Sequence, residues 1–289
     1  MTTRDTPQLR KFCEDDGIAE IYKDFTFQYC LDELERSIAK AETEGKIASM
    51  KEHSYAMMDS ETINRHIDIE RESRARPVIL DNFLDVPEPD RSVGQIEFTP
   101  TLPIPNPTLI PDRLFVSFTP VIIIRHPVKT LPSLLRASGQ LVGATVFDAD
   151  FPMDSSFKWQ RMVYDCYKAW FSSSGGCDES LPIVIDADKL INNSEGQMEV
   201  LCKRVGLDPA GIKYTWETQA PDNQAQAIFG KTLFESTAVI QGEKTANPPV
   251  LEDEVKRWAK EWDEETAREM KRRVELNLPD YEYLLQRSI

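Results

Sequence analysis

The sequence predicts an α/β fold: a three-layer sandwich with a mainly parallel central sheet. Two observations support this prediction. Residues 121–124 ("VIII") and the stretch "LPIVIDADKL" contain continuous runs rich in β-branched residues, which are typical of strands buried on both faces of a parallel sheet. Each run is followed by a helical pattern, and this alternation of strand and helix is typical of a doubly wound sheet.

The first predicted helix spans residues 26–44. Its apolar residues recur at helical spacing on one face, whereas glutamates and lysines take the other face, and Gly45 provides a stop signal. The predicted apolar face comprises Phe27, Cys30, Leu31, Leu34, Ile38 and Ala41. The following "KIASMKEHSYAMM" is a candidate short strand that ends at Lys51, Glu52 and His53.

Residues 77–113 are rich in proline, which excludes long helices there. We predict a long, ordered surface excursion that serves as a lid, because long structured loops inside compact domains tend to be functional. The strand at 121–124 then leads into a helix that starts near Pro127 and stops at Gly139.

The second half of the chain is predicted to be mostly helical. In "NSEGQMEVLCKRVG", Ser194 and Gln197 form a capping box and Gly206 ends the helix. Residues 251–276 form a long charged helix with an apolar side, and "LPDYEYLLQRSI" closes the chain as a short helix.

Composition limits the classes of partner. There are 49 acidic and 34 basic residues, so the net charge of -15 argues against nucleic acid and anionic membranes as partners. No window approaches 18 consecutive apolar residues, and the first residues lack the apolar core of a signal peptide, so we expect a cytoplasmic protein. The five cysteines have irregular spacings and predict neither a disulfide framework nor a metal site.

Two junctions carry residue types suited to chemistry. At the first, Arg125 precedes a helix start whose free N–H groups can bind an anion, and Ser133 adds a hydroxyl two turns later. The alternative is an ion pair between Arg125 and Asp186 or Asp188. At the second, Lys51 and His53 are two residues apart, which places a cation beside a histidine that can accept a proton. The alternative there is a solvated turn histidine.

The order of these motifs resembles the sulfotransferase superfamily. The resemblance rests on "KEH", on "RHP" with a serine eight residues after the arginine, and on "IVIDADKL" and "LCKRVGL". The ending "LPDYEYLLQ" is similar to sulfotransferase-like P-loop proteins of fungi and bacteria. The resemblance covers roughly residues 26–289, which it implies are a single sulfotransferase-like α/β domain.

The resemblance implies a role for each matching residue. Arg125 and Ser133 fall on the pair that binds the 3′-phosphate of the donor, 3′-phosphoadenylyl sulfate. Lys51 and His53 fall on the pair in which the histidine deprotonates the acceptor hydroxyl and the lysine faces the sulfuryl group. Residues 235–244 more loosely resemble a Ser-Thr loop near the donor.

Residues 1–25 depart from the family pattern, because they contain no apolar strand and no glycine- or serine-rich turn before a helix. We therefore expect a divergent N-terminal segment in which the first strand and the P-loop are missing. Without the P-loop, the donor's 5′-phosphosulfate lacks its nest of N–H groups, and sulfuryl transfer loses most of its rate.

Three functions follow. In the first, the protein uses no cofactor and acts in secondary metabolism on a small apolar, natural-product-like substrate. His53, with Glu52 or Lys51, is then the acid–base pair for cyclisation, isomerisation or dehydration. The second is sulfuryl transfer from 3′-phosphoadenylyl sulfate to a hydroxyl. The third is a non-catalytic binding or scaffold protein. An exposed sheet edge makes a homo-oligomer a natural expectation for the first and third functions.

Overall fold

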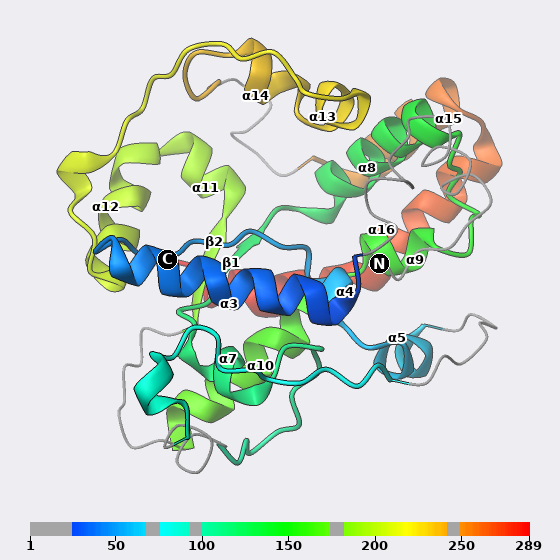
Figure 1. Cartoon of the computed structure of the whole chain (residues 1–289). Coiled ribbons are helices and arrows are strands. Elements are labelled where there is room, and N and C mark those ends of the chain that lie inside the picture. Colours follow the sequence, from blue (N-terminus) through cyan, green and yellow to red (C-terminus); the bar gives the residue numbers. More distant parts are fainter. Residues whose placement is uncertain (1–24, 68–75, 93–99, 174–181, 242–248) are drawn as a thin grey trace. The chain divides into compact units, whose positions relative to one another are not determined.

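The computed structural model of the chain describes residues 25–67, 76–92, 100–173, 182–241 and 249–289 (Figure 1). These residues form a helix-rich α/β structure with a small parallel sheet. The chain divides into two compact units, Met1–Thr119 with Met162–Glu179 and Pro120–Arg161 with Ser180–Ile289, which are considered separately below. Almost all of the predicted N-terminal segment 1–25 lies outside the described residues. The prediction that the first strand and the P-loop are missing concerns this same segment.

In the first unit, α3 (Phe27–Thr43) confirms the helix predicted over 26–44. Thr26 caps its start by accepting a hydrogen bond from the Tyr29 N–H at 3.0 Å, and Gly45 follows its end with a φ of 65°. The predicted apolar face is wrong at two points. Cys30 is exposed, and Glu35 is fully buried, because this side of the helix packs on polar groups as well as apolar ones.

The short strand predicted after this helix is absent from residues 46–53, all of which are described. They are irregular, and Ile47 and Met50 are 70% and 47% exposed. A strand needs a neighbour to complete its hydrogen bonds, and no segment within the described ranges pairs with residues 46–53. Two short helices follow, α4 (Ser54–Met57) and α5 (Ser60–His66).

The described part of the proline-rich stretch 77–113 contains the short η1 (Glu88–Asp90), helical residues 91–92, an isolated bridge from Thr108 to Met58, and the start of α7 (Asp112–Ser117). The unit's core includes the 162–173 part of α10 (Lys158–Ser173), where Tyr167 stacks on Phe115 with ring centroids 4.0 Å apart. The Tyr167 hydroxyl donates to the Phe115 carbonyl at 2.7 Å, so this buried phenol is satisfied.

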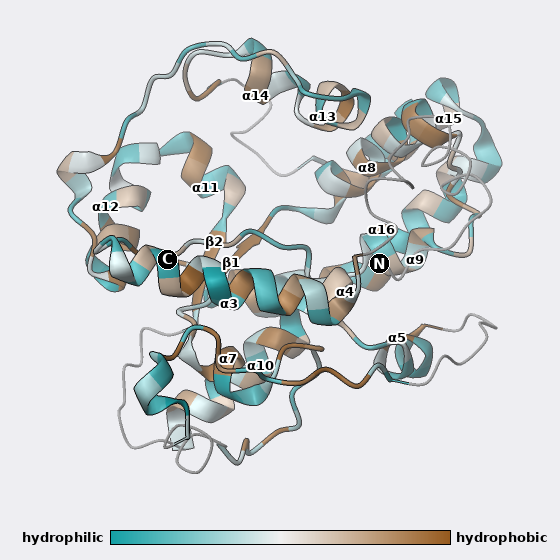
Figure 2. Ribbon diagram, in the orientation of Figure 1, coloured by the Kyte–Doolittle hydropathy of each residue, from teal (hydrophilic) through white to brown (hydrophobic). Residues whose placement is uncertain are grey.

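In the second unit, β1 (Val121–Ile124) and β2 (Ile183–Asp186) pair in parallel, as predicted, with Val121 opposite Ile183. Both strands have the brown colour of hydrophobic residues in Figure 2. Every residue of β2 is buried, but Ile123 of β1 is 57% exposed although its partner Ile185 is 2% exposed. The prediction that both strands are buried on both faces is therefore wrong for β1. Tertiary packing, rather than the composition of the run, decides which part of a face is covered.

Two helix boundaries in this unit differ from the predictions. The helix after β1 is α8 (Pro127–Val142), which continues past Gly139 and ends at Gly143, where φ is 67°. The cap of α12 (Ser194–Val205) is Asn193, whose Oδ1 accepts from the Gly196 N–H at 3.2 Å. Ser194 instead donates to a carbonyl of the preceding helix, so the predicted capping box does not form.

The last two helices pack against each other and form much of the unit's core. The helix predicted over 251–276 is in fact interrupted, because Asp263 caps a new helix by accepting from the Thr266 N–H at 2.7 Å. The result is α15 (Leu251–Glu261) and α16 (Glu264–Leu285), the latter continuing through Pro279. The remaining elements are α9 (Phe151–Ser155), α11 (Ala187–Asn192), η2 (Pro209–Gly211), α13 (Gln224–Phe229) and α14 (Lys231–Glu235). None of the helices in the described ranges is long and apolar enough to cross a membrane.

Candidate functional site

The structure brings the predicted Lys51 and His53 side chains into contact. Lys51 Nζ lies 2.8 Å from His53 Nε2, both residues are exposed, and the pair directly precedes α4. An ammonium group can only donate, so the imidazole accepts through Nε2 and is neutral in this arrangement. The His53 ring also stacks on Tyr55, with ring centroids 5.5 Å apart. The result is an accessible cation and base.

Glu52, the other residue predicted as an acid–base partner, contacts the backbone of His53. Its Oε1 accepts from the backbone N–H of His53 at 2.6 Å, rather than contacting the imidazole through that bond. The carboxylate therefore helps to fix the backbone at His53.

At the other junction, Arg125 forms the ion pair that the sequence left open as an alternative. Arg125 Nε lies 3.2 Å from Asp188 Oδ1, and Lys129 Nζ lies 2.7 Å from Asp188 Oδ2. Since parallel strands place their carboxyl ends at the same edge of the sheet, the residues after β1 meet those after β2. The Arg125 side chain remains 39% exposed, so it is accessible to a ligand.

The start of α8 does not offer the free N–H groups that were expected there. Pro127 has no N–H, and the Val128 N–H donates to His126 Nδ1 at 3.2 Å. The N–H groups of Lys129 and Thr130 both donate to the His126 carbonyl. Burial, followed by the charge of Lys129, lowers the pKa of His126, which favours the neutral ring that this cap requires.

Ser133 lies on the exposed side of α8, and no hydrogen bond joins it to Arg125 in this structure. Lys51, Glu52 and His53 belong to the first unit, whereas Arg125 and Ser133 belong to the second. The two sets of predicted site residues therefore belong to different units, and each set is described within its own unit.

Asp186 at the end of β2 and Tyr281 of α16 form a buried polar pair that was not predicted as part of a site. Asp186 is 3% exposed, and its Oδ1 and Oδ2 accept from the Lys189 N–H and the Tyr281 hydroxyl at 3.0 and 3.2 Å. Burial and the nearby Asp186 raise the pKa of Tyr281. The acidic end of the strand was visible in the sequence, but no local signal pairs it with a tyrosine from α16.

The second unit also contains an open cavity of about 330 Å³ beside the start of α12. Asn193, Glu195 and Tyr214 contribute polar groups to it, and Val239 comes from the segment 235–244 that was compared with a donor loop. Residues 242–248 of that segment lie outside the described residues.

Two curated fungal proteins, both named sulfotransferase ppzF, are similar to the chain. The protein from Metarhizium majus (strain ARSEF 297) is 26% identical over 275 residues, which cover 91% of this chain and 76% of the relative. The chain is related to the sulfotransferase superfamily. The protein from Metarhizium rileyi (strain RCEF 4871) is 24% identical over 278 residues, with the same coverage.

No protein-family model and no solved structure matches this sulfotransferase-related chain. The family resemblance drawn from its motifs is confirmed. Its helix-rich α/β structure with a small parallel sheet is compatible with a sulfotransferase-like fold. The three-layer sandwich and the missing P-loop stay predictions.

Proposed function

We propose that the protein is a sulfotransferase that transfers a sulfuryl group from 3′-phosphoadenylyl sulfate to a hydroxyl of a small apolar, natural-product-like molecule. The observation that carries this proposal is the 2.8 Å contact between Lys51 Nζ and His53 Nε2 in an exposed position. The relatives' name supports the same reaction, since the similarity extends over 91% of the chain.

In this reaction His53 is the base. Its Nε2 takes the proton of the acceptor hydroxyl, the hydroxyl oxygen bonds to sulfur, and the bond between sulfur and the donor's phosphate oxygen breaks. The lone pair that must accept this proton is the one that Lys51 occupies in the structure. Lys51 therefore has to move away before His53 can act, and its ammonium is then available to the transferring group.

Arg125 and Ser133 are the proposed ligands of the donor's 3′-phosphate. The fit rests on side chains alone, because the N–H groups at the start of α8 are already used. A guanidinium binds phosphate well, but here Asp188 competes for it at 3.2 Å. To bind the phosphate, Arg125 therefore has to share its guanidinium between Asp188 and the phosphate, or to exchange Asp188 for the phosphate.

The same competition, together with the predicted absence of a P-loop, favours a second candidate function, which is donor-independent acid–base chemistry at His53. One carboxylate, Asp188, already holds both Arg125 and Lys129, and this reduces the positive potential available to a nucleotide. In this case the substrate is a small apolar molecule that undergoes cyclisation, isomerisation or dehydration without a cofactor.

Calorimetric titration with adenosine 3′,5′-bisphosphate, the product of the donor, distinguishes the two candidates. Sulfuryl transfer predicts micromolar binding, about -8 kcal/mol. Arg125→Ala should weaken it, whereas Arg257→Ala, which removes an exposed arginine of the same unit, should not. Absence of binding at millimolar ligand overturns the sulfotransferase proposal and leaves the donor-independent reaction.

If the nucleotide binds, transfer from labelled 3′-phosphoadenylyl sulfate to a panel of phenols and alcohols tests the base. His53→Ala should abolish transfer and leave nucleotide affinity unchanged. The matched control is His66→Ala, because His66 Nδ1 contacts the Thr62 carbonyl within α5. Full transfer by His53→Ala would exclude His53 as the base.

A further inference from the structure

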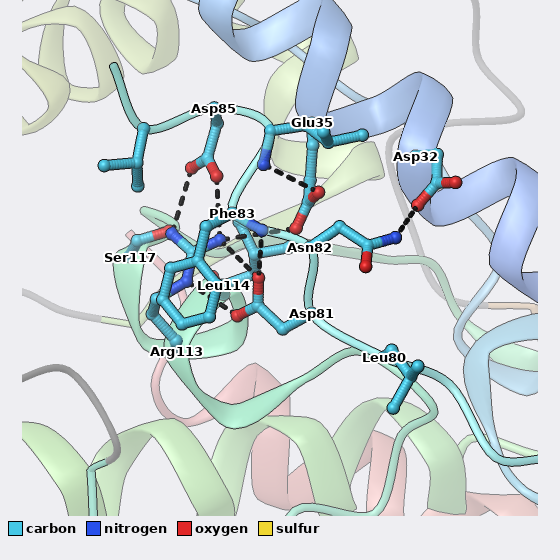
Figure 3. Close-up of polar contacts among 12 residues, drawn as sticks. Asp32, Glu35, Leu80, Asp81, Asn82, Phe83, Asp85, Arg113, Leu114 and Ser117 are labelled. Carbon is cyan, nitrogen blue, oxygen red and sulfur yellow. Dashed lines mark hydrogen bonds and ion pairs between the residues drawn. The ribbon is translucent and has the colours of Figure 1, made fainter. Parts of the chain in front are cut away.

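Three carboxylates surround one guanidinium inside the first unit (Figure 3). Arg113, in α7, forms two bonds with Asp81 at 2.6 and 2.9 Å and two with Asp85 at 2.7 and 3.1 Å. It also donates to Glu35 of α3 at 3.3 Å. The Glu35 side chain is 0% exposed and the other three are at most 14% exposed, so little solvent screens their charges.

One polar face of α3 binds the segment that contains the two aspartates. Gln28, Asp32 and Glu35 are spaced by four and three residues and so lie on the same side of the helix. The Gln28 amide donates to the Leu80 carbonyl at 2.9 Å and accepts from the Leu80 N–H at 2.7 Å. Asn82 donates to Asp32 at 2.8 Å, and the Leu84 N–H donates to Glu35 Oε2 at 3.1 Å. These bonds attach residues 80–84 to α3.

Charge balance within the cluster requires a proton. If all three carboxylates were ionised, a single guanidinium would leave two negative charges uncompensated in a buried place, which is strongly unfavourable. Asp32, the other acid on this face of α3, already accepts bonds from Gln28 and Asn82. Glu35 is the most buried of the carboxylates and is the group expected to keep the proton.

The directions of the pKa shifts agree with this geometry. Burial raises the pKa of Glu35 from 4.5 to about 7, and the hydrogen bond with Asp81 and the negative charges of Asp81 and Asp85 add to the effect. For Asp81 burial acts in the same direction, but bonds from Arg113 and Glu35 outweigh it and lower the pKa. Glu35 is thus the donor, and Asp81 the ionised acceptor.

The backbone of the bound segment is strained at its centre. Phe83 has a φ of 54°, which lies in the left-handed region that a bulky residue rarely adopts. Its ring lies 4.6 Å from the Arg113 guanidinium carbon, and it is 9% exposed. Such a conformation persists only while the surrounding contacts hold it, so the segment relaxes when those contacts weaken.

We infer that the protonated carboxyl of Glu35 is a latch that holds segment 80–85 on α3 and releases it when the proton is lost. This inference is independent of the proposed sulfuryl transfer. Glu35 contributes stability that is fully present below pH 4.5 and is lost as the pH rises through about 7. Asp81, whose pKa is lowered from 3.8, contributes stability that is lost in acid instead. The latch is therefore tightest at mildly acidic pH.

Hydrogen exchange of peptides covering residues 80–85, measured by mass spectrometry on the full chain, tests the latch. After correction for the intrinsic pH dependence of exchange, the opening constant should rise about tenfold between pH 6 and 8. Glu35→Gln keeps the size of the side chain but cannot ionise, so its opening constant should not change over this range.

Glu33→Gln is the matched control, since Glu33 is an exposed residue of the same helix that pairs with Arg36. It should retain the wild-type pH dependence. Asp81→Asn removes one negative charge from the cluster and should shift the transition to lower pH, a change that a purely structural role would not cause. A flat wild-type profile, or an unchanged pH dependence in Glu35→Gln, overturns the inference.

Discussion

Replacement of Arg113 by lysine should destabilise the protein although the charge is retained. Arg113 makes five hydrogen bonds to three carboxylates, two of which it binds through pairs of donors. A lysine ammonium has three donors and no planar fork, so it loses at least two of these bonds. Because Arg113 is only 11% exposed, water cannot fully replace them.

The expected loss follows from these bonds. Hydrogen bonds to charged groups contribute about 1.5–3 kcal/mol each, and partial relaxation reduces the sum, so Arg113→Lys should cost about 2–4 kcal/mol of unfolding free energy. Arg113→Met leaves the carboxylates without a cation and should cost about 3–5 kcal/mol. For a protein of this size, 3 kcal/mol corresponds to a decrease in Tm of about 5 °C.

Urea denaturation followed by circular dichroism, together with thermal melting at pH 6, measures these losses. The control is Arg257→Lys, because Arg257 is 65% exposed and pairs with Glu254 one helical turn away. Its effect should remain within about 0.5 kcal/mol. If Arg113→Lys is as stable as this control, the cluster does not hold the segment and the reasoning is refuted.

Three further predictions concern the second unit. Asn277→Ala removes the Oδ1 that accepts from the buried Phe157 N–H at 2.8 Å, and it should cost about 1–3 kcal/mol in urea denaturation; an unchanged midpoint would show that this N–H has another partner. Burial lowers the pKa of His126 from 6.5, so its stability contribution is present above pH 6.5 and is lost as the pH falls below it. His126→Asn keeps a cap for Val128 without titrating, and its Tm should fall less than that of the wild type between pH 7.5 and 5. Asp188→Asn releases the two cations that it holds and should tighten adenosine 3′,5′-bisphosphate binding about threefold to tenfold in calorimetry; weaker binding would mean that the carboxylate positions Arg125 instead of competing with phosphate.

The helices and strands were predictable where local chemistry decides them. Thr26 and Gly45 mark the start and the end of α3. Both were predictable, because a side-chain cap and a left-handed glycine act on backbone groups only a few residues away. The two β-branched runs became β1 and β2 for a similarly local reason. The choice between Asn193 and Ser194 as a cap was not predictable, because both are good caps and the Ser194 hydroxyl found a carbonyl in the preceding turn.

The candidate site was predictable in part. The contact between Lys51 and His53 follows from their spacing, although the strand expected to carry them is absent from this described segment. The ion pair of Arg125 with Asp188 was visible only as one alternative, since it depends on the meeting of two strand ends 63 residues apart. Nothing local indicated that His126 would use up the N–H groups of its own helix start.

By itself, the sequence determined the helix α3, the strands β1 and β2 with their parallel pairing, the family relationship and the histidine–lysine pair. Each depends on periodicity, short-range capping or the order of motifs. Only the tertiary structure decided that the polar side of α3 is a binding surface and that Glu35 is buried in it. The reason is that Asp81, Asp85 and Arg113 lie 46, 50 and 78 residues further along the chain, and their charges act on Glu35 only after folding has removed the water between them.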